Sequence, residues 1–141
     1  RTAGSLLDEL SRSGADLVRQ VVDDLAAGTA AAHPQEGTPT AAPKLHREDA
    51  ALRFTEPDDA VHARLRGVTP EPGAFCRWGE QTLKIHEATI ARDAPALPPG
   101  ALRRDGARVL VGTVTHPLEL LRVQPAGKQA MSAADWARGW P

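Results

Sequence analysis

The sequence predicts a mainly β protein: a small closed β-barrel preceded by two short helices and a linker. Three observations support this fold class. Long apolar stripes at helical spacing occur only near the start of the chain. The second half contains several short apolar runs separated by Gly and Pro. One of these runs is long and changes phase in its middle, as expected of a strand that bends into a barrel.

Residues 2–27 predict two short helices, or one broken helix. Two apolar stripes follow each other at helical spacing, and Gly14 and Gly28 punctuate them. The first stripe is Leu6, Leu7 and Leu10, and the second is Leu17, Val18, Val21, Val22 and Leu25. The next segment, GTAAAHPQEGTPTAAPKL, is a linker without a core-forming pattern. Since an apolar face must be buried, we expect the second stripe to self-associate, to recruit a neighbour, or to leave residues 1–27 poorly ordered.

The next element is a short helix over TEPDDAVHARLRG, with Thr55 as its N-cap and Gly67 at its end. A long strand follows over QTLKIHEATIARD. Its apolar residues change parity between Ile85 and Ala88, which predicts a β-bulge.

Two further strands and a helix complete the barrel. The strands are expected over ARVLVG and LELLRVQP. In SAADWARGW, Ser132 is the expected N-cap of a terminal helix, and Trp136 and Trp140 are spaced to meet on one helical face.

Length, composition and charge limit the kinds of protein to which this chain can belong. The 141 residues allow one ordinary domain, or one small domain plus part of another. The single cysteine, Cys76, excludes an internal disulfide and fits a reducing cytoplasm. No apolar run approaches the roughly 20 residues that cross a bilayer, so no membrane partner is expected. The net charge is -1, with a mild basic bias confined to residues 44–141.

Signatures of catalysis and metal binding are absent from the sequence. There is no glycine-rich phosphate loop and no Gly-x-Ser-x-Gly turn. The five histidines never fall four residues apart on a helix, so they are interpreted as surface residues and no metal site is predicted. Cys76 beside Arg77 has no nearby base, which favours an inert strand thiol. We therefore predict no catalytic residue in this chain.

Four ordered strings resemble the C-terminal part of the methionyl-tRNA formyltransferase family. They are PQEGTPTAAPKLHREDAALRF (34–54), AVHARLRGVTPEPGAF (60–75), TLKI (82–85) and VQPAGKQAMSAADWARG (123–139). The stretch before them is similar to the last helices of that family's catalytic domain. The resemblance implies terminal helices of a formyltransferase domain at 1–30, an interdomain linker at 31–48, and an OB-like, Greek-key tRNA-binding barrel at 49–141.

The resemblance also implies a function. These enzymes move a formyl group from 10-formyltetrahydrofolate to the methionyl amino group on initiator tRNA, in translation initiation. The family's catalytic residues precede the region matched here, so the chain alone is expected to be inactive and to bind no cofactor. Its implied partners are initiator Met-tRNA and the upstream formyltransferase domain.

Basic side chains on a small barrel suit contacts with RNA phosphates. With two Phe, three Trp and no Tyr, base stacking is expected to be secondary to recognition of the backbone and shape of a folded RNA. Lys128 is the candidate of most interest, because it follows Gly127 in a turn and lies within a family-like string. The predicted tRNA-binding residues are Lys44, Arg66, Arg77, Lys84, Arg103, Arg104 and Lys128.

Each candidate has a simpler interpretation as a solvated surface charge, and the turn at Lys128 can equally serve to close the barrel. Two other functions also remain open. The chain can belong to another formyltransferase-superfamily enzyme, such as a formyltetrahydrofolate hydrolase or dehydrogenase or a sugar formyltransferase. It can also be a free-standing OB module that binds single strands or a protein.

Overall fold

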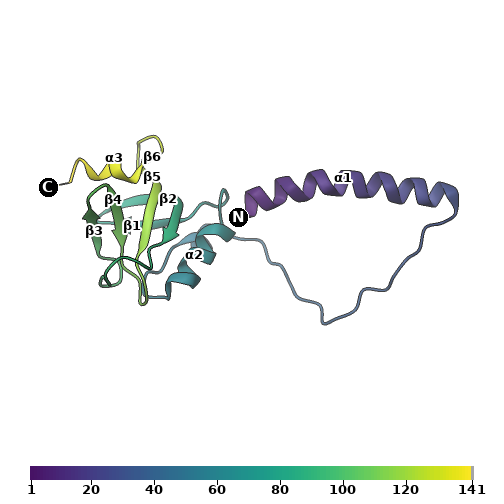
Figure 1. Cartoon of the computed structure of the whole chain (residues 1–141), viewed down its shortest axis with the longest axis horizontal. Coiled ribbons are helices and arrows are strands. Elements are labelled where there is room, and N and C mark those ends of the chain that lie inside the picture. Colours follow the sequence, from purple (N-terminus) through teal and green to yellow (C-terminus); the bar gives the residue numbers. More distant parts are fainter. Residues whose placement is uncertain (141) are drawn as a thin grey trace.

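The fold is a curled β-sheet domain with a long helix beside it (Figure 1). The structure is a computed structural model that describes residues 1–140. The helices are α1 (Ala3–Ala27), the 3-10 turn η1 (Arg47–Ala50), α2 (Asp58–Gly67) and α3 (Ala133–Ala137). The strands are β1 (Phe75–Trp78), β2 (Gln81–Ile90), β3 (Leu102–Asp105), β4 (Arg108–Val111), β5 (Leu118–Pro125) and β6 (Met131–Ser132).

The strands form one antiparallel sheet in the order β1-β2-β5-β4-β3, with the short β6 added to β5. Strands β3, β4 and β5 are consecutive neighbours, and β5 returns to lie beside β2, which is a Greek-key connection. The predicted bulge is confirmed: the register of β2 against β5 shifts between Ile85 and Glu87 and again at Ala88. The bulge lets Ile85 and Ala88 both point into the core despite their opposite parity.

The mainly β, OB-like fold is confirmed, with one difference from a closed barrel. Within residues 1–140, no strand ladder joins β1 to β3. The gap leads into a small apolar cavity lined by residues that include Phe54, Cys76 and Leu102. The core lies behind it, where Leu83, Val111 and other sheet residues pack against α2 and α3. OB-type barrels are often partly open in this way.

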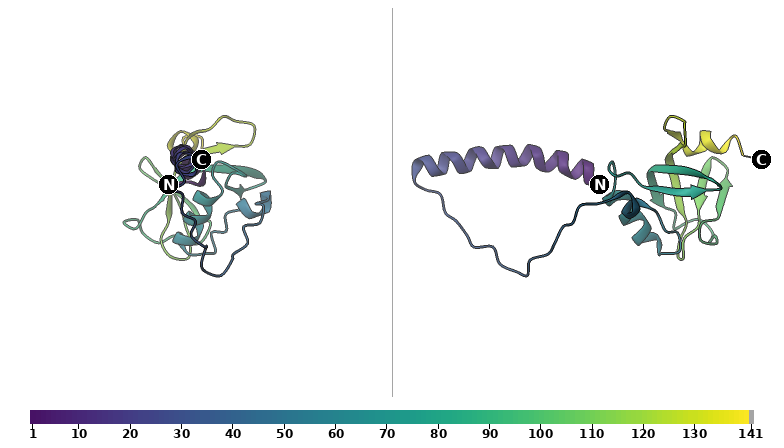
Figure 2. Two further views of the ribbon diagram at one scale, coloured as in Figure 1. Left: turned by 90° about the vertical axis from the view of Figure 1, so that its right-hand side faces the viewer. Right: turned by 180° about the vertical axis from the view of Figure 1, so that it is seen from behind.

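Helix α1 corrects the prediction of two short helices. It runs unbroken from Ala3 to Ala27, because a glycine inside a helix costs only about 1 kcal/mol relative to alanine and the other residues of α1 outweigh this cost. Thr2 and Ser5 form a reciprocal capping box at its start, and Gly28 ends it with a φ of 71°. None of its residues is buried. The helix projects away from the barrel and the linker returns from its far end (Figures 1 and 2).

Helix α2 begins two residues later than predicted. Pro57, not Thr55, occupies the N-cap position, and the first helical residue is Asp58. The carboxylate of Asp58 is buried and accepts hydrogen bonds from the Thr115 hydroxyl at 2.7 Å and from His116 Nδ1 at 3.0 Å. This long-range pairing fixes the start of α2 against the β4–β5 connection. His116 is thus a structural residue rather than the free surface histidine that the sequence suggests.

The terminal helix follows the prediction. Ser132 Oγ accepts the backbone N–H of Asp135 as an N-cap. The ring centroids of Trp136 and Trp140 lie 4.8 Å apart in an edge-to-face contact, although Trp140 lies beyond the helix end. Trp78 of β1 joins them, at 5.1 Å from Trp136. The three indoles fasten α3 to the first strand.

Candidate nucleic-acid interface

A basic groove crosses the outer side of the β2–β5 pair. It is lined by Arg47, Thr82, Lys84, Gln124, Pro125, Ala126 and Gly127, and we call it the β2–β5 groove. Leu83 and Ile85 point into the core, so Lys84 between them points outward and is exposed. Gln124 is directly opposite Lys84 on β5. Antiparallel pairing therefore places a cation and an amide side by side in the floor of the groove.

Gln124 is held by two hydrogen bonds. Its Oε1 lies 3.1 Å from His86 Nε2, and its Nε2 donates to the carbonyl oxygen of Lys128 at 2.9 Å. Because an amide oxygen can only accept, the His86 ring must carry a proton on Nε2. This chain of contacts links strand β2, strand β5 and the turn after β5.

The turn itself has the predicted form. β5 ends at Pro125, Gly127 has a φ of 71°, and the Lys128 N–H donates to the Pro125 carbonyl at 3.0 Å. The positive φ requires glycine. Lys128 is exposed at the end of this braced turn, next to the groove.

Arg47 enters the groove from η1, directly after the linker. Its guanidinium carbon lies 5.3 Å from the centre of the Phe75 ring, a cation–π contact. Phe75 is the cross-strand neighbour of Lys84, so the two positive charges share one face of the sheet. Arg47 was missed by the sequence reasoning. Its position only three residues after Lys44 was the available signal.

The seven predicted residues do not form a single cluster. Lys84 lines the β2–β5 groove, and Lys128 follows its lining residue Gly127 and accepts a hydrogen bond from Gln124 through its backbone carbonyl. The exposed Lys44 precedes the groove in the linker. Arg66 lies on α2, in a hollow that also includes His62 and His86. The remaining three lie on the two strands that flank the opening of the barrel, Arg77 on β1 and Arg103 and Arg104 on β3.

Ion pairing separates these candidates from other basic residues. Within residues 1–140, none of the seven forms a salt bridge. By contrast, Arg108 is held between Asp93 and Glu119, each at 2.7 Å, and Arg64 pairs with Glu56 at 3.1 Å. Arg77 and Arg104 only donate to nearby backbone carbonyls. The charges of the candidates are therefore available to an external anion.

Other chemistry is limited. Burial raises the pKa of Cys76 to about 11, so the thiol is protonated and unreactive at neutral pH, as its sequence context suggests. Among the residues described, no group of three or more His, Cys, Asp or Glu side chains is arranged to hold a metal ion. The same residues include no helix that is long and apolar enough to span a membrane.

Comparison with known proteins identifies the family. Residues 44–141 match the family model described as formyl transferase, C-terminal domain. The chain belongs to this family. It is 57% identical over 138 residues to the methionyl-tRNA formyltransferase of Leifsonia xyli and 52% identical to that of Clavibacter michiganensis. These matches cover 98% of this chain but only 45% of each relative.

Solved structures support the fold of this formyl transferase C-terminal domain. A HypX variant from Aquifex aeolicus superimposes with a TM-score of 0.73 over 98% of the chain and 26% of HypX. A second HypX variant gives a TM-score of 0.65. At 15% sequence identity both likenesses establish a shared fold only.

Proposed function

We propose that this chain is the C-terminal part of a methionyl-tRNA formyltransferase, and that it binds and positions initiator Met-tRNA. Formylation of the methionyl amino group from 10-formyltetrahydrofolate would then occur in an upstream formyltransferase domain, in the cytoplasm. The observation that carries the proposal is the set of unpaired basic side chains at the β2–β5 groove, in a chain 52–57% identical to methionyl-tRNA formyltransferases.

The domain division proposed from the sequence fits this role. Residues 1–30 are the last helical segment of the formyltransferase domain, residues 31–48 the linker, and residues 49–141 the tRNA-binding domain. The exposed stripe on α1, with Leu17 61% and Leu25 64% exposed, supports contact with another apolar surface. In the longer protein that surface is the formyltransferase domain. In the isolated chain, self-association through Leu17, Val18, Val21, Val22 and Leu25 is the expected substitute.

The groove suits RNA phosphates better than unstacked bases. Arg47, Lys84 and Lys128 supply positive charge within one region, and Gln124 supplies polar groups between them. Trp136 and Trp140 pack against each other and against Trp78, so the indoles are engaged in holding α3. Recognition through the backbone and shape of a folded RNA is the mode that this arrangement favours.

Arg66 extends the proposed surface. The hollow beside it includes His86, and His86 is hydrogen-bonded to Gln124 of the β2–β5 groove. A phosphate backbone lying along the groove can therefore continue past His86 toward Arg66. Arg77, Arg103 and Arg104 are proposed as a separate, peripheral contact.

A salt titration tests the proposal. Binding of the 141-residue chain to initiator tRNA is measured at several salt concentrations for the wild type and for the double variant Arg47→Ala/Lys84→Ala. If each residue contacts one phosphate, the double variant lowers the log–log salt slope by roughly 1.5 to 2. Arg138→Ala is the matched control, because it removes an exposed charge that is already paired with Asp135 at 3.0 Å.

The result distinguishes the alternatives. An unchanged slope in the double variant, with wild-type binding intact, would remove the groove from the interface. Tighter binding to an unstructured oligonucleotide than to tRNA would favour a general OB module. Restored formylation of Met-tRNA on adding the upstream domain, but not of a free sugar nucleotide, would exclude a sugar formyltransferase.

A further inference from the structure

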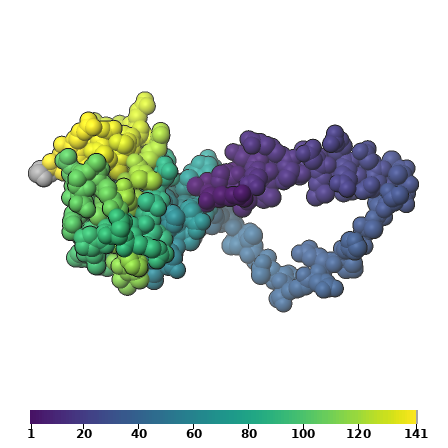
Figure 3. Space-filling view, in the orientation of Figure 1, coloured from purple at the N-terminus to yellow at the C-terminus, as the bar shows by residue number. Residues whose placement is uncertain are grey.

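Within residues 1–140, helix α1 touches the β domain at its first turn. The backbone N–H of Gly4 donates to the carbonyl oxygen of Thr69 at 3.0 Å. Gly4 also lies against the ring of Pro70, and the space-filling view shows the N-terminal end of α1 against the domain (Figure 3). We call this contact of Gly4 with Thr69 and Pro70 the Gly4–Pro70 joint.

The hydrogen bond at the joint satisfies a donor that a free helix leaves open. The first N–H groups of a helix have no partner within it. The Thr2 side chain accepts the N–H of Ser5, so the capping box does not serve Gly4. The carbonyl of Thr69 takes that role from outside the helix.

The receiving turn is braced. The Thr69 hydroxyl donates to the Leu65 carbonyl at 2.6 Å, which ties the turn to the last part of α2. The Gly73 N–H donates to the Val68 carbonyl at 2.9 Å across the turn. The carbonyl and ring that receive Gly4 therefore have little freedom to move.

The linker cannot supply the same restraint. Every residue from 31 to 45 is exposed, and within residues 1–140 this segment forms no hydrogen bond or ion pair. A chain without internal contacts limits distance but does not set an angle. Any fixed direction of α1 relative to the barrel must come from the joint.

The joint has no room for a side chain at position 4. A Cβ atom added to Gly4 would lie 2.5 Å from Pro70 Cδ, far inside normal contact, and a proline ring cannot rotate away. Gly14 of the same helix has nothing within 4 Å of such an atom. Both glycines lie in α1, but only Gly4 has a neighbour that an added Cβ would overlap, which makes Gly14 the control for the effect of alanine on the helix itself.

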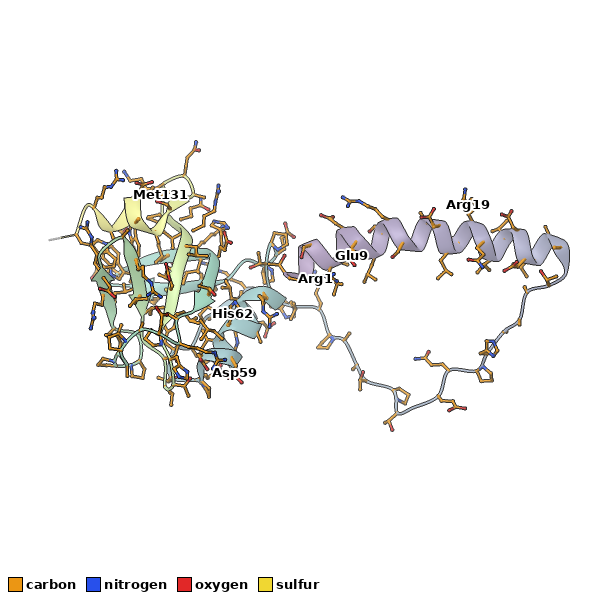
Figure 4. The ribbon with its side chains drawn as sticks, in the orientation of Figure 1. Arg1, Glu9, Arg19, Asp59, His62 and Met131 are labelled. Atoms are coloured by element: carbon orange, nitrogen blue, oxygen red, sulfur yellow. The ribbon has the colours of Figure 1, made fainter. Side chains whose placement is uncertain are left out.

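We propose that the Gly4–Pro70 joint is an intramolecular docking surface that sets the direction of α1 relative to the β domain. The segment that docks is the first turn of α1. Its Gly4 backbone donates a hydrogen bond to Thr69 and packs against Pro70. Docking also places Arg1 and Ser5 in the lining of the hollow that includes His62 and Arg66. Figure 4 shows Arg1 at the start of α1 and His62 on α2. This proposed role of the joint concerns the orientation of α1 and does not depend on RNA binding.

The test measures the distance between α1 and the barrel in the full 141-residue chain. Spin labels are placed at Gln20→Cys and Asp105→Cys in a Cys76→Ala background. The labelled chain is diluted with an excess of unlabelled chain, so that self-association through α1 adds no intermolecular distance, and distance distributions are recorded by pulsed electron paramagnetic resonance. Three chains are compared, carrying Gly4, Gly4→Ala or Gly14→Ala. Circular dichroism checks that α1 remains helical in each, as expected because alanine favours a helix over glycine.

The expected result is one narrow distribution for the Gly4 chain and for Gly14→Ala, and a shifted, broadened distribution for Gly4→Ala. A distribution as narrow and centred for Gly4→Ala as for the unmodified chain would overturn the proposal. So would a broad distribution already present with Gly4 in place. Failure of tRNA binding alone would leave the joint unaffected, because the distance measurement contains no RNA.

Discussion

Replacing Gly112, the residue directly after β4, with alanine should strongly destabilise the β domain. Gly112 follows β4 and lies against the segment that leads into β3. An added Cβ would lie 2.6 Å from the carbonyl oxygen of Leu97 and closer still to that of Pro98. Both neighbours are backbone atoms, so no side-chain rotation relieves the overlap.

The expected loss of stability in Gly112→Ala can be estimated from the backbone that must move. Relieving the overlap displaces residues 97–101 by most of an ångström, and such overpacking costs about 1–3 kcal/mol. The same displacement strains two hydrogen bonds at 2.9 Å, from Gly112 N–H to the Ala101 carbonyl and from Gly100 N–H to the Gly112 carbonyl. Each is worth roughly 0.5–1.5 kcal/mol. We expect Gly112→Ala to lower the free energy of unfolding by about 3–5 kcal/mol.

Chemical denaturation followed by tryptophan fluorescence measures this loss. The midpoint of thermal unfolding, Tm, should fall by roughly 12 °C or more for a domain of this size. Gly67→Ala is the control, since Gly67 has nothing within 4 Å of an added Cβ and no positive φ. The control should change stability by less than about 1 kcal/mol. A Gly112→Ala protein within 0.5 kcal/mol of wild type, on the order of a surface substitution, would refute the reasoning about the β4 end.

Three further changes test other parts of the structure. Trp136→Ala should lower the free energy of unfolding by about 3–5 kcal/mol in denaturation experiments, because the 8%-exposed indole packs α3 against β1. A decrease of less than about 1 kcal/mol would contradict that role. Cys76 should resist a thiol reagent at pH 8 and react once the chain unfolds, since burial raises its pKa to about 11. Burial acts to raise the pKa of Asp58, but hydrogen bonds from Thr115 and His116 outweigh it and leave the pKa lowered. Its contribution to stability is therefore present above pH 3.8 and lost as pH falls further, so Asp58→Asn should flatten the acid limb of a stability–pH curve.

Strands β2, β4 and β5 were predictable because each carries a local signal, whereas the short strands β1, β3 and β6 were not predicted. The phase change between Ile85 and Ala88 located the bulge, and the run over 118–125 matches β5 residue for residue. The apolar face of α3 and its Ser132 cap were equally local. Short-range periodicity and capping chemistry suffice for such elements.

Features that depend on distant partners were not predictable. Thr55 resembles a helix cap, but the start of α2 is fixed by Thr115 and His116, 57 and 58 residues beyond Asp58. Gly14 suggests a helix break, yet the remaining residues of α1 favour a helix strongly enough to carry it. Short sequence patterns do not show which effect decides the start of α2 or the continuity of α1.

The residues of the proposed interface show the same difference between local signals and distant contacts. Lys84 could be assigned to the outer face from strand alternation, and Lys128 from its turn. Arg47 joins them through its cation–π contact with Phe75. Gln124 is oriented by hydrogen bonds to His86 and to the Lys128 carbonyl. Arg77, Arg103 and Arg104 were grouped with them in the sequence, but they belong to strands at the opposite ends of the sheet order.

The most direct test of the central claim is the salt dependence of tRNA binding by the 141-residue chain. Binding should be measurable at low salt and should weaken linearly in log–log form as salt rises, because each phosphate contact releases counterions. The slope should decrease when Arg47 and Lys84 are replaced and stay unchanged when Arg138 is replaced. Absence of binding at the lowest salt, or binding that does not respond to salt, would contradict a phosphate-binding role for this domain.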